Sequence, residues 1–128
     1  MEAYEPSLSG GNIRIANEVV GIIAGLAATE VKGVAGMSGG VVDGLAELLK
    51  KKNMAKGVKV EVGERQAAVD LFVILEYGAK VPEVAYKIQE NVKRAIESMT
   101  GLEVVEVNVH IQGVEIRQDE PAEESRVR

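Results

Sequence analysis

Apolar and polar residues alternate most clearly along residues 68–77, which predicts a β-strand. One face of this strand is formed by apolar residues at every second position: Val69, Leu71, Val73 and Leu75. The other face is also apolar in its middle, where it presents Phe72 and Ile74. A strand that is apolar on both faces is typical of the centre of a sheet, so we expect neighbouring strands along both of its edges.

A helix and a second strand are predicted after this central strand. Apolar residues recur at helical spacing from Val81 to Met99 and form one stripe: Val84, Ile88, Val92, Ile96 and Met99. Pro82 suits the first turn of this helix, and Gly101 suits the position just past its end. Alternation then resumes and predicts a strand over residues 104–112. Because a helix joins the two strands, we expect them to run parallel, with the apolar stripe docked on the sheet.

The strand before the central one is predicted over residues 58–62, with a hairpin loop between them. Pairing of Val62 with Ala67 would place Lys59 opposite Asp70 on the outer face of the sheet. The expected strand order is 58–62, 68–77, 104–112. Together these elements predict an α/β (α+β) fold, a two-layer sandwich with a small mixed sheet, a β-β-α-β unit at its C-terminal end and two N-terminal helices.

The N-terminal half gives weaker signals. Ile13 and Ile15 favour a short strand, and residues 16–32 have the apolar spacing of a helix. A glycine-rich link over residues 33–40 then leads to a second, shorter helix over residues 41–52. We expect a flexible leader, a single domain and a disordered charged tail, in this order: 1–11, 12–116 and 117–128.

The outer face of the predicted sheet carries the candidate binding surface. Phe72 and Ile74 lie on it, and the strand at 104–112 adds an uncharged polar row: Asn108, His110 and Gln112. The N-terminal helices or a second subunit would have to cover this face. Where they leave it open, an apolar patch with a polar rim is typical of a protein interface. We therefore expect these five residues to mediate self-association, as a homo-oligomer, or docking to a protein partner.

Composition narrows the classes of function. The chain has 128 residues, enough for one domain with its own core, and its net charge of −5 disfavours nucleic-acid binding. Without cysteine and with His110 as the single histidine, it offers no disulfide and no multi-histidine metal site. Its start lacks the pattern of a signal peptide, and its longest apolar run is too short to span a bilayer. We expect a cytoplasmic protein that inserts into no membrane and binds no cofactor or metal.

Three weaker features have a plain explanation beside the functional one. The glycines between residues 33 and 44 lack the spacing and the Gly-Lys-Ser/Thr ending of a phosphate loop, so a turn between helices is preferred. A basic run is formed by Lys50, Lys51, Lys52 and Lys56. Its default interpretation is a solvated helix end, with contact to an anionic surface as the alternative. His110 has no nucleophile at a recognisable spacing, so no catalytic residue is predicted.

Three segments together resemble the alkaline-shock (envelope stress response) protein family of Gram-positive bacteria: GNIRIANEVVGIIAGLAATEVKGVAGM, AAVDLFVILEYGAKVPEVAYKIQENV and MTGLEVVEVNVHIQGV. The similarity runs from about Gly11 to Glu115. The resemblance implies a small cytoplasmic protein without known catalysis. Some members are held at the membrane by a separate anchoring partner and serve envelope homeostasis, while others are linked to control of fatty-acid synthesis. The tails of this chain are shorter than those of the more strongly charged members, and the family offers no ligand residues to carry over.

Two classes of function follow. The first is a non-enzymatic interaction or scaffold protein of the cell-envelope stress response and envelope homeostasis, which is peripheral to the membrane only through a partner. The second is a regulator of fatty-acid or lipid metabolism that binds a small acyl or phosphate metabolite near the glycine link. An apolar pocket open to solvent would favour the regulator. A filled core beneath an exposed apolar sheet face would favour the interaction protein.

Overall fold

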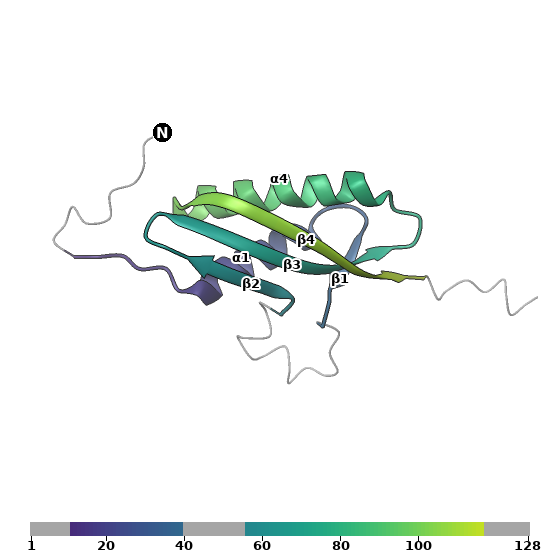
Figure 1. The fold of residues 1–128 in the computed structure, drawn as a ribbon, viewed down its shortest axis with the longest axis horizontal. Helices are drawn as coiled ribbons and strands as arrows, with labels where there is room; N and C mark the ends of the chain where they lie inside the picture. The colour runs from purple at the N-terminus through teal and green to yellow at the C-terminus, as the bar shows by residue number, and fades with distance from the viewer. Residues whose placement is uncertain (1–10, 40–55, 117–128) are drawn as a thin grey trace, which may run out of the picture.

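The computed structural model describes residues 11–39 and 56–116, which form two helices packed on a four-stranded mixed sheet (Figure 1). In chain order these elements are α1 (Asn17–Thr29), β1 (Val34–Met37), β2 (Val58–Val62), β3 (Gln66–Glu76), α4 (Val81–Thr100) and β4 (Glu103–Glu115). The α/β (α+β) class and the mixed sheet predicted from the sequence are confirmed. The second helix predicted at 41–52 lies outside the described residues, as do most of the predicted leader and all of the tail.

Strand β3 is the centre of the sheet, as predicted. Along one edge it pairs in parallel with β4, from Gln66 opposite Glu103 to Glu76 opposite Glu115. Its other edge pairs antiparallel with β2 and then with β1. The predicted order of β2, β3 and β4 is therefore confirmed. The predicted register also holds, because Val62 lies opposite Ala67 and Lys59 lies opposite Asp70.

The short strand β1 was not predicted from the sequence. Strands β2 and β1 follow one another along the same edge of β3 and meet at Phe72. The amide of Phe72 donates to the carbonyl of Gly57 at 2.8 Å, and its carbonyl accepts from the amide of Ser38 at 2.7 Å. The interpretation of residues 33–40 as a glycine link was wrong in this respect. Four residues that include Gly36 give too short an alternation to stand out from a turn.

The core lies between the sheet and the helices. Odd-numbered side chains of β3 are all buried on this side: Ala67, Val69, Leu71, Val73 and Leu75. They meet the predicted stripe of α4, of which Val84, Ile88, Val92 and Ile96 are buried. Met99 was placed in that stripe, but its side chain is 70% exposed. The buried residues step by four, and a step of three from Ile96 to Met99 turns away from the sheet.

Helix α1 packs beside α4 on the same side of the sheet. Its buried surface is built from small residues that permit close approach, among them Ala24, Ala27 and Ala28. The side-chain amide of Asn91 on α4 donates to the carbonyl of Ala27 at 2.8 Å and fixes the two helices together. The helix is shorter than the predicted 16–32. Neither Ile13 nor Ile15 belongs to a strand, which corrects the prediction of a strand there.

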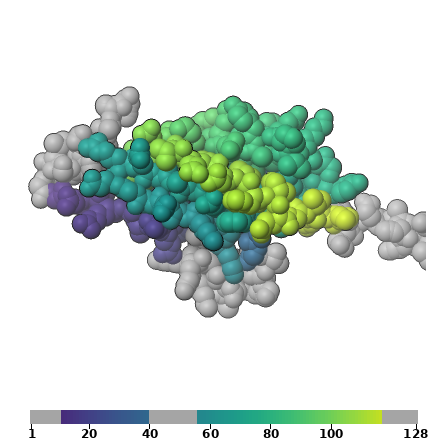
Figure 2. All heavy atoms as spheres, viewed as in Figure 1, coloured from purple at the N-terminus to yellow at the C-terminus, as the bar shows by residue number. Residues whose placement is uncertain are grey.

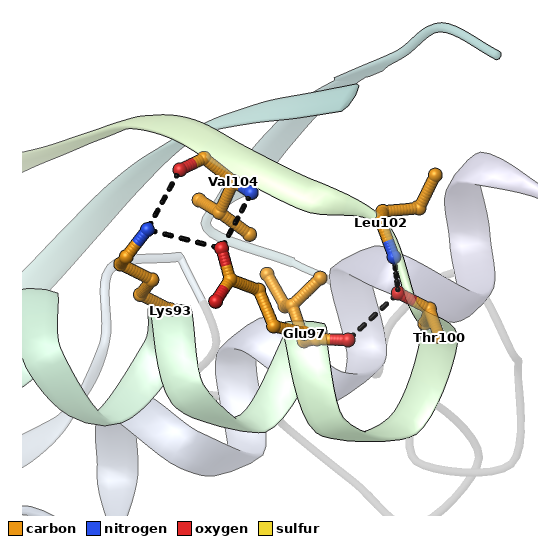
Figure 3. Close-up of polar contacts among 6 residues, drawn as sticks. Lys93, Glu97, Thr100, Leu102 and Val104 are labelled. Atoms are coloured by element: carbon orange, nitrogen blue, oxygen red, sulfur yellow. Dashed lines mark hydrogen bonds and ion pairs between the residues drawn. The ribbon is translucent and has the colours of Figure 1, made fainter. Parts of the chain in front are cut away.

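The turn from α4 into β4 is held by side chains of the helix (Figure 3). Gly101 ends α4 with φ = 79°, a left-handed conformation that favours glycine. Glu97 accepts from the amide of Val104 at 2.9 Å and from Lys93 at 3.0 Å, and Lys93 also donates to the carbonyl of Val104 at 3.2 Å. The bond from the Val104 amide, followed by that from Lys93, lowers the pKa of Glu97. Because this pKa is lowered, the carboxylate contributes stability above the ordinary pKa of a glutamate, and that stability is lost as the pH falls through the lowered value.

Alanine substitution at two glycines with positive φ, one at the junction of β1 and β2 and one outside it, provides a test of that junction. Gly57 and Gly78 have φ = 84° and 97°, so alanine at either position should cost about 1–2 kcal/mol of folding free energy. Only at Gly57 would a Cβ also meet neighbours, at 2.9 Å from the carbonyl oxygen of Ser38 and 2.9 Å from the Cβ of Met37. We expect Gly57→Ala to destabilise the protein by about 1–3 kcal/mol more than Gly78→Ala in urea unfolding. Equal losses would contradict the observed junction.

Candidate functional site on the open face of the sheet

The face of the sheet opposite the helices presents the five residues predicted as an interface. Even-numbered side chains of β3 point to this face, and Phe72 and Ile74 on it are half-buried. Asn108, His110 and Gln112 of β4 share the face with them, since Asn108 lies opposite Asp70 and His110 opposite Phe72. The strands that form the sheet lie side by side at the molecular surface (Figure 2). The structure thus brings the predicted residues together, and whether they bind a partner stays a prediction.

An aromatic stack forms the centre of this face. The rings of Phe72 and His110 lie 4.5 Å apart between centroids and 10° from parallel. The ammonium group of Lys59 lies 5.6 Å from the centroid of the Phe72 ring, a distance compatible with a cation–π contact. Two flat rings from neighbouring strands therefore provide an apolar platform with a cation at one side. Lys59 and Asp70 are register neighbours, as predicted.

Polar groups extend the platform across the sheet. His110 Nε2 lies 3.2 Å from the carboxylate of Asp70, and Asn108 donates to the same carboxylate at 3.0 Å. Asn108 also donates to Glu106 at 3.0 Å. On the other side of the platform, the hydroxyl of Ser38 donates to Gln112 at 2.8 Å, across the width of β3. These bonds hold the side chains of the open face in one arrangement.

The Asp70 carboxylate is the titratable group most affected by these contacts. The bond with His110, followed by the bond from Asn108, lowers its pKa, and partial burial opposes them. Because the folded-state pKa is lowered, the carboxylate contributes stability above its ordinary pKa of about 3.9 and loses it as the pH falls through the lowered value. The side chains of His110 and Asp70 are 45% and 40% exposed, so the pair is accessible to a partner.

The described residues also line two hollows outside the aromatic stack. One is a polar depression of about 360 Å³ on the open face, above the small side chain of Ala68, and is lined by Lys59, Val60, Glu61, Ala68, Asp70, Glu106 and Asn108. The other is an apolar groove of about 400 Å³ between α1 and α4, lined by Val19, Ile22, Ile23, Leu26, Ala27, Glu30, Ala95 and Met99. Within residues 11–39 and 56–116, no group of three or more acidic or histidine side chains is placed to hold a metal ion.

Of the lysine run and the glycine cluster that the sequence analysis considered as binding sites, only part lies within the described residues. Lys56 is exposed, while Lys50, Lys51 and Lys52 lie outside the described residues, so the anionic-surface contact stays a prediction. The part of the glycine cluster that is described, up to Gly39, forms the turn before β1, β1 itself and the turn after it. The contact of His110 with Asp70 was missed from the sequence. Alternation places both residues on one face, but the parallel register that makes them neighbours is set by the α4 connection and by the bulge after Val104.

Comparison with known proteins identifies the family of this chain. The sequence model of an alkaline-shock protein family, described as having a "cell envelope-related function", matches residues 5–116. The chain belongs to this family. Relatives named as stress response regulators agree with this membership and with the resemblance found in the sequence. Within the described residues, no helix is both long and apolar enough to cross a membrane.

Proteins similar to this chain are found in Bacillus and Streptococcus. The protein YqhY of Bacillus subtilis is 38% identical over 117 residues, covering 91% of this chain and 85% of the relative. A Streptococcus pyogenes protein named "Stress response regulator gls24 homolog" is 35% identical over 114 residues, covering 88% of this chain and 64% of that protein. Among solved structures, a MamM CTD variant has a TM-score of 0.46 and 18% identity, covering 79% of this chain and 96% of that one.

The pKa of Asp70 provides a test of the open-face geometry. In His110→Ala protein we expect this pKa to rise toward its ordinary value, because the contact that lowers it most is lost. Asn108→Ala should raise it by a smaller amount. Carbon-detected NMR titration of the Asp70 carboxyl in the wild type and both variants measures the three values. An unchanged pKa in His110→Ala protein would show that the two side chains are not in contact in solution.

Proposed function

We propose that this chain is a non-enzymatic interaction protein of the cell-envelope stress response, and that it docks a protein partner through the open face of its sheet. One observation carries the proposal. Both described helices pack on the opposite side, so the stacked Phe72 and His110 and the neighbouring Ile74 are left at the surface. Membership of an envelope-related family supports the cellular context. In this proposal the partner, and not the chain itself, contacts the membrane.

The chemistry of the open face defines the partner surface that would fit it. The paired rings offer a flat apolar area, and the carboxylates of Asp70 and Glu106 lie beside it as acceptors. An aromatic or aliphatic side chain flanked by an arginine would complement both features, since arginine can stack on a ring and donate to carboxylates. Such residues are common at the centres of protein interfaces.

The same geometry supports binding without turnover. His110 and Asp70 have the contact of a base and the group that orients it, but a nucleophile in reach of the base would also be needed. Ser38 is the hydroxyl that the described residues place on this face, and it donates to Gln112. Hydrolysis of simple esters or phosphates that disappears in His110→Ala protein would contradict a non-enzymatic role.

Site-specific photo-crosslinking tests the docking surface. A photoreactive phenylalanine analogue at position 74 in native cells should form a discrete adduct with an envelope-associated protein. The same analogue at position 86 provides the control, because Tyr86 is exposed on α4, away from the open face. In a background with Phe72→Ala, which removes one ring of the platform, we expect the adduct from position 74 to fall severalfold.

Folding must be checked in the same experiment by circular dichroism and thermal unfolding. Phe72 is half-buried and lies outside the core, so Phe72→Ala should leave the fold intact. A folded Phe72→Ala protein that forms the adduct at the wild-type level would count against docking through this face. Adducts of equal yield and identity from positions 74 and 86 would do the same.

A second candidate function is favoured by the apolar groove between α1 and α4. In that proposal the chain is a regulator of lipid metabolism that binds a small acyl metabolite along Leu26, Ala95 and Met99. Leu26 and Met99 are 55% and 70% exposed, although apolar side chains of this size are more often buried. The groove lies between two helices and not at the glycine link where the sequence interpretation placed it.

Filling the groove tests this second candidate. Ala95→Trp would place an indole among the apolar residues of the groove, and Tyr86→Ala is a control elsewhere on α4. If an acyl chain binds there, titration with a fluorescent long-chain fatty acid should show saturable binding in the wild type and the control. Affinity should fall about tenfold or more in Ala95→Trp protein, because burial of several methylene groups would be lost. Equal binding by all three proteins would reject the groove as the site.

A further inference from the structure

Strand β4 has one edge paired with β3 and one edge that faces away from it. Because the backbone amide and carbonyl of Phe72 both bond toward β1 and β2, alternation directs those of Leu71 and Val73 toward β4. In a parallel ladder, these groups bond to the residues on either side of the register partner. The register partners themselves, Val109 and Ile111, therefore direct their own amides and carbonyls to the outer edge of the sheet.

Side chains of α4 occupy the first part of this outer edge. Glu97 and Lys93 bond to the amide and carbonyl of Val104, as Figure 3 shows, and Gln89 donates to the carbonyl of Val107 at 3.0 Å. Beyond Val107 the described side chains provide no such partner for the outward groups of Val109 and Ile111. Among the residues that the structure describes, the outer edge of β4 is thus covered at its N-terminal part and open over its C-terminal part.

The open part also lacks the prolines, lysines and arginines by which many natural edge strands avoid pairing. From Glu103 to Glu115 the strand contains no proline, lysine or arginine. Its helix-side residues Val107, Val109 and Ile111 are only partly buried by the rest of the molecule. An edge with free backbone groups and incompletely covered apolar side chains is suited to the addition of another strand.

We propose that β4 pairs antiparallel with β4 of a second copy of this chain across a two-fold axis near Val109. The charge pattern favours a second copy in this direction. Residues 107–114 carry no formal charge when His110 is neutral, and an antiparallel pair centred on Val109 sets Glu106 opposite Gln112 of the second copy. A parallel pair in register would instead set Glu106 beside Glu106. Bulges after Val104 and after Ile111 delimit the regular stretch that pairs.

The proposed dimer and the proposed partner docking depend on different atoms of β4. The dimer uses backbone groups of the outer edge, and docking uses side chains of the open face. Between its two bulges, the odd residues of β4 supply the backbone groups of the outer edge, while the even residues place their side chains on the open face. The contact amounts to a few backbone hydrogen bonds and three apolar side chains per copy. We therefore expect an equilibrium between monomer and dimer that depends on protein concentration.

Proline substitution can block pairing along the outer edge of β4 without affecting the edge that pairs with β3. Val109→Pro removes an amide that points to the open edge, so the pairing with β3 is kept and pairing with a second copy is blocked. Sedimentation velocity over a wide concentration range should show dimers in the wild type. The dimerisation constant of Val109→Pro protein should weaken by about tenfold or more, since two symmetry-related hydrogen bonds are lost. Val109→Ile, which keeps the amide, is the matched control and should dimerise as the wild type does.

Hydrogen exchange followed by NMR provides the second readout. In the wild type, protection of the Val109 amide should rise with protein concentration, while the amides of Asn108 and His110, bonded to β3, should be protected throughout. If Val109→Pro does not fold, Val109→Lys serves in its place, because a lysine on an edge strand also opposes pairing. A wild type that is monomeric at all concentrations would overturn the proposal. So would a dimer that persists in Val109→Pro and is lost in Phe72→Ala, which would place the contact on the open face.

Discussion

The alternation of β3 is the constraint on which the rest of this structure depends. Its odd-numbered side chains fill the core, and its backbone groups are used on both edges, toward β4 on one side and toward β2 and β1 on the other. A shift of the register by one residue would exchange the core face for the open face. Because both edges of β3 are paired, the sheet can contact other molecules only through its open face or the outer edges of its flanking strands.

Both described helices lie on one side of the sheet because the small residues of α1 let it share that side with α4. Ala24 and Ala28 are fully buried, so α1 approaches its neighbours closely, and Asn91 links it to α4. Burial of each Val, Leu or Ile side chain in this layer contributes about 1.5–3 kcal/mol, which concentrates the stability of the fold on the helix side. Neither described helix packs against the open face. This face carries a stacked pair of rings and hydrogen-bonded polar groups.

How much could be predicted from the sequence depended on the length of the pattern and on the range of the interaction. The alternation of β3 and the stripe of α4 extend over many residues, so both elements, the hairpin register and the five residues of the open face followed from spacing alone. Strand β1 has four residues and a glycine, and its pairing with β3 depends on contacts distant in sequence. The contact between Asp70 and His110 spans 40 positions and one bulge, which no local pattern encodes. The prediction that Met99 is buried was wrong because Met99 follows Ile96 by three residues, whereas the buried residues of the stripe are four apart.

Strand β4 contributes side chains to the open face and backbone groups to the outer edge of the sheet. The same alternation determines which residues do each, and it connects the two proposed binding surfaces. Since α4 directs Glu97, Lys93 and Gln89 to the first part of the outer edge, the helix that closes the core also limits where another strand can add. Pairing of two copies about Val109 would continue the sheet from one copy into the other, and both open faces would then lie on the same side of one longer sheet. His110, next to Val109, would lie close to the axis in each copy, so two aromatic platforms would be presented together. A partner that docks on one platform would meet the second at a fixed distance, and its binding would gain from a high effective concentration. A weak edge contact can in this way strengthen recognition on a different surface of the same strand.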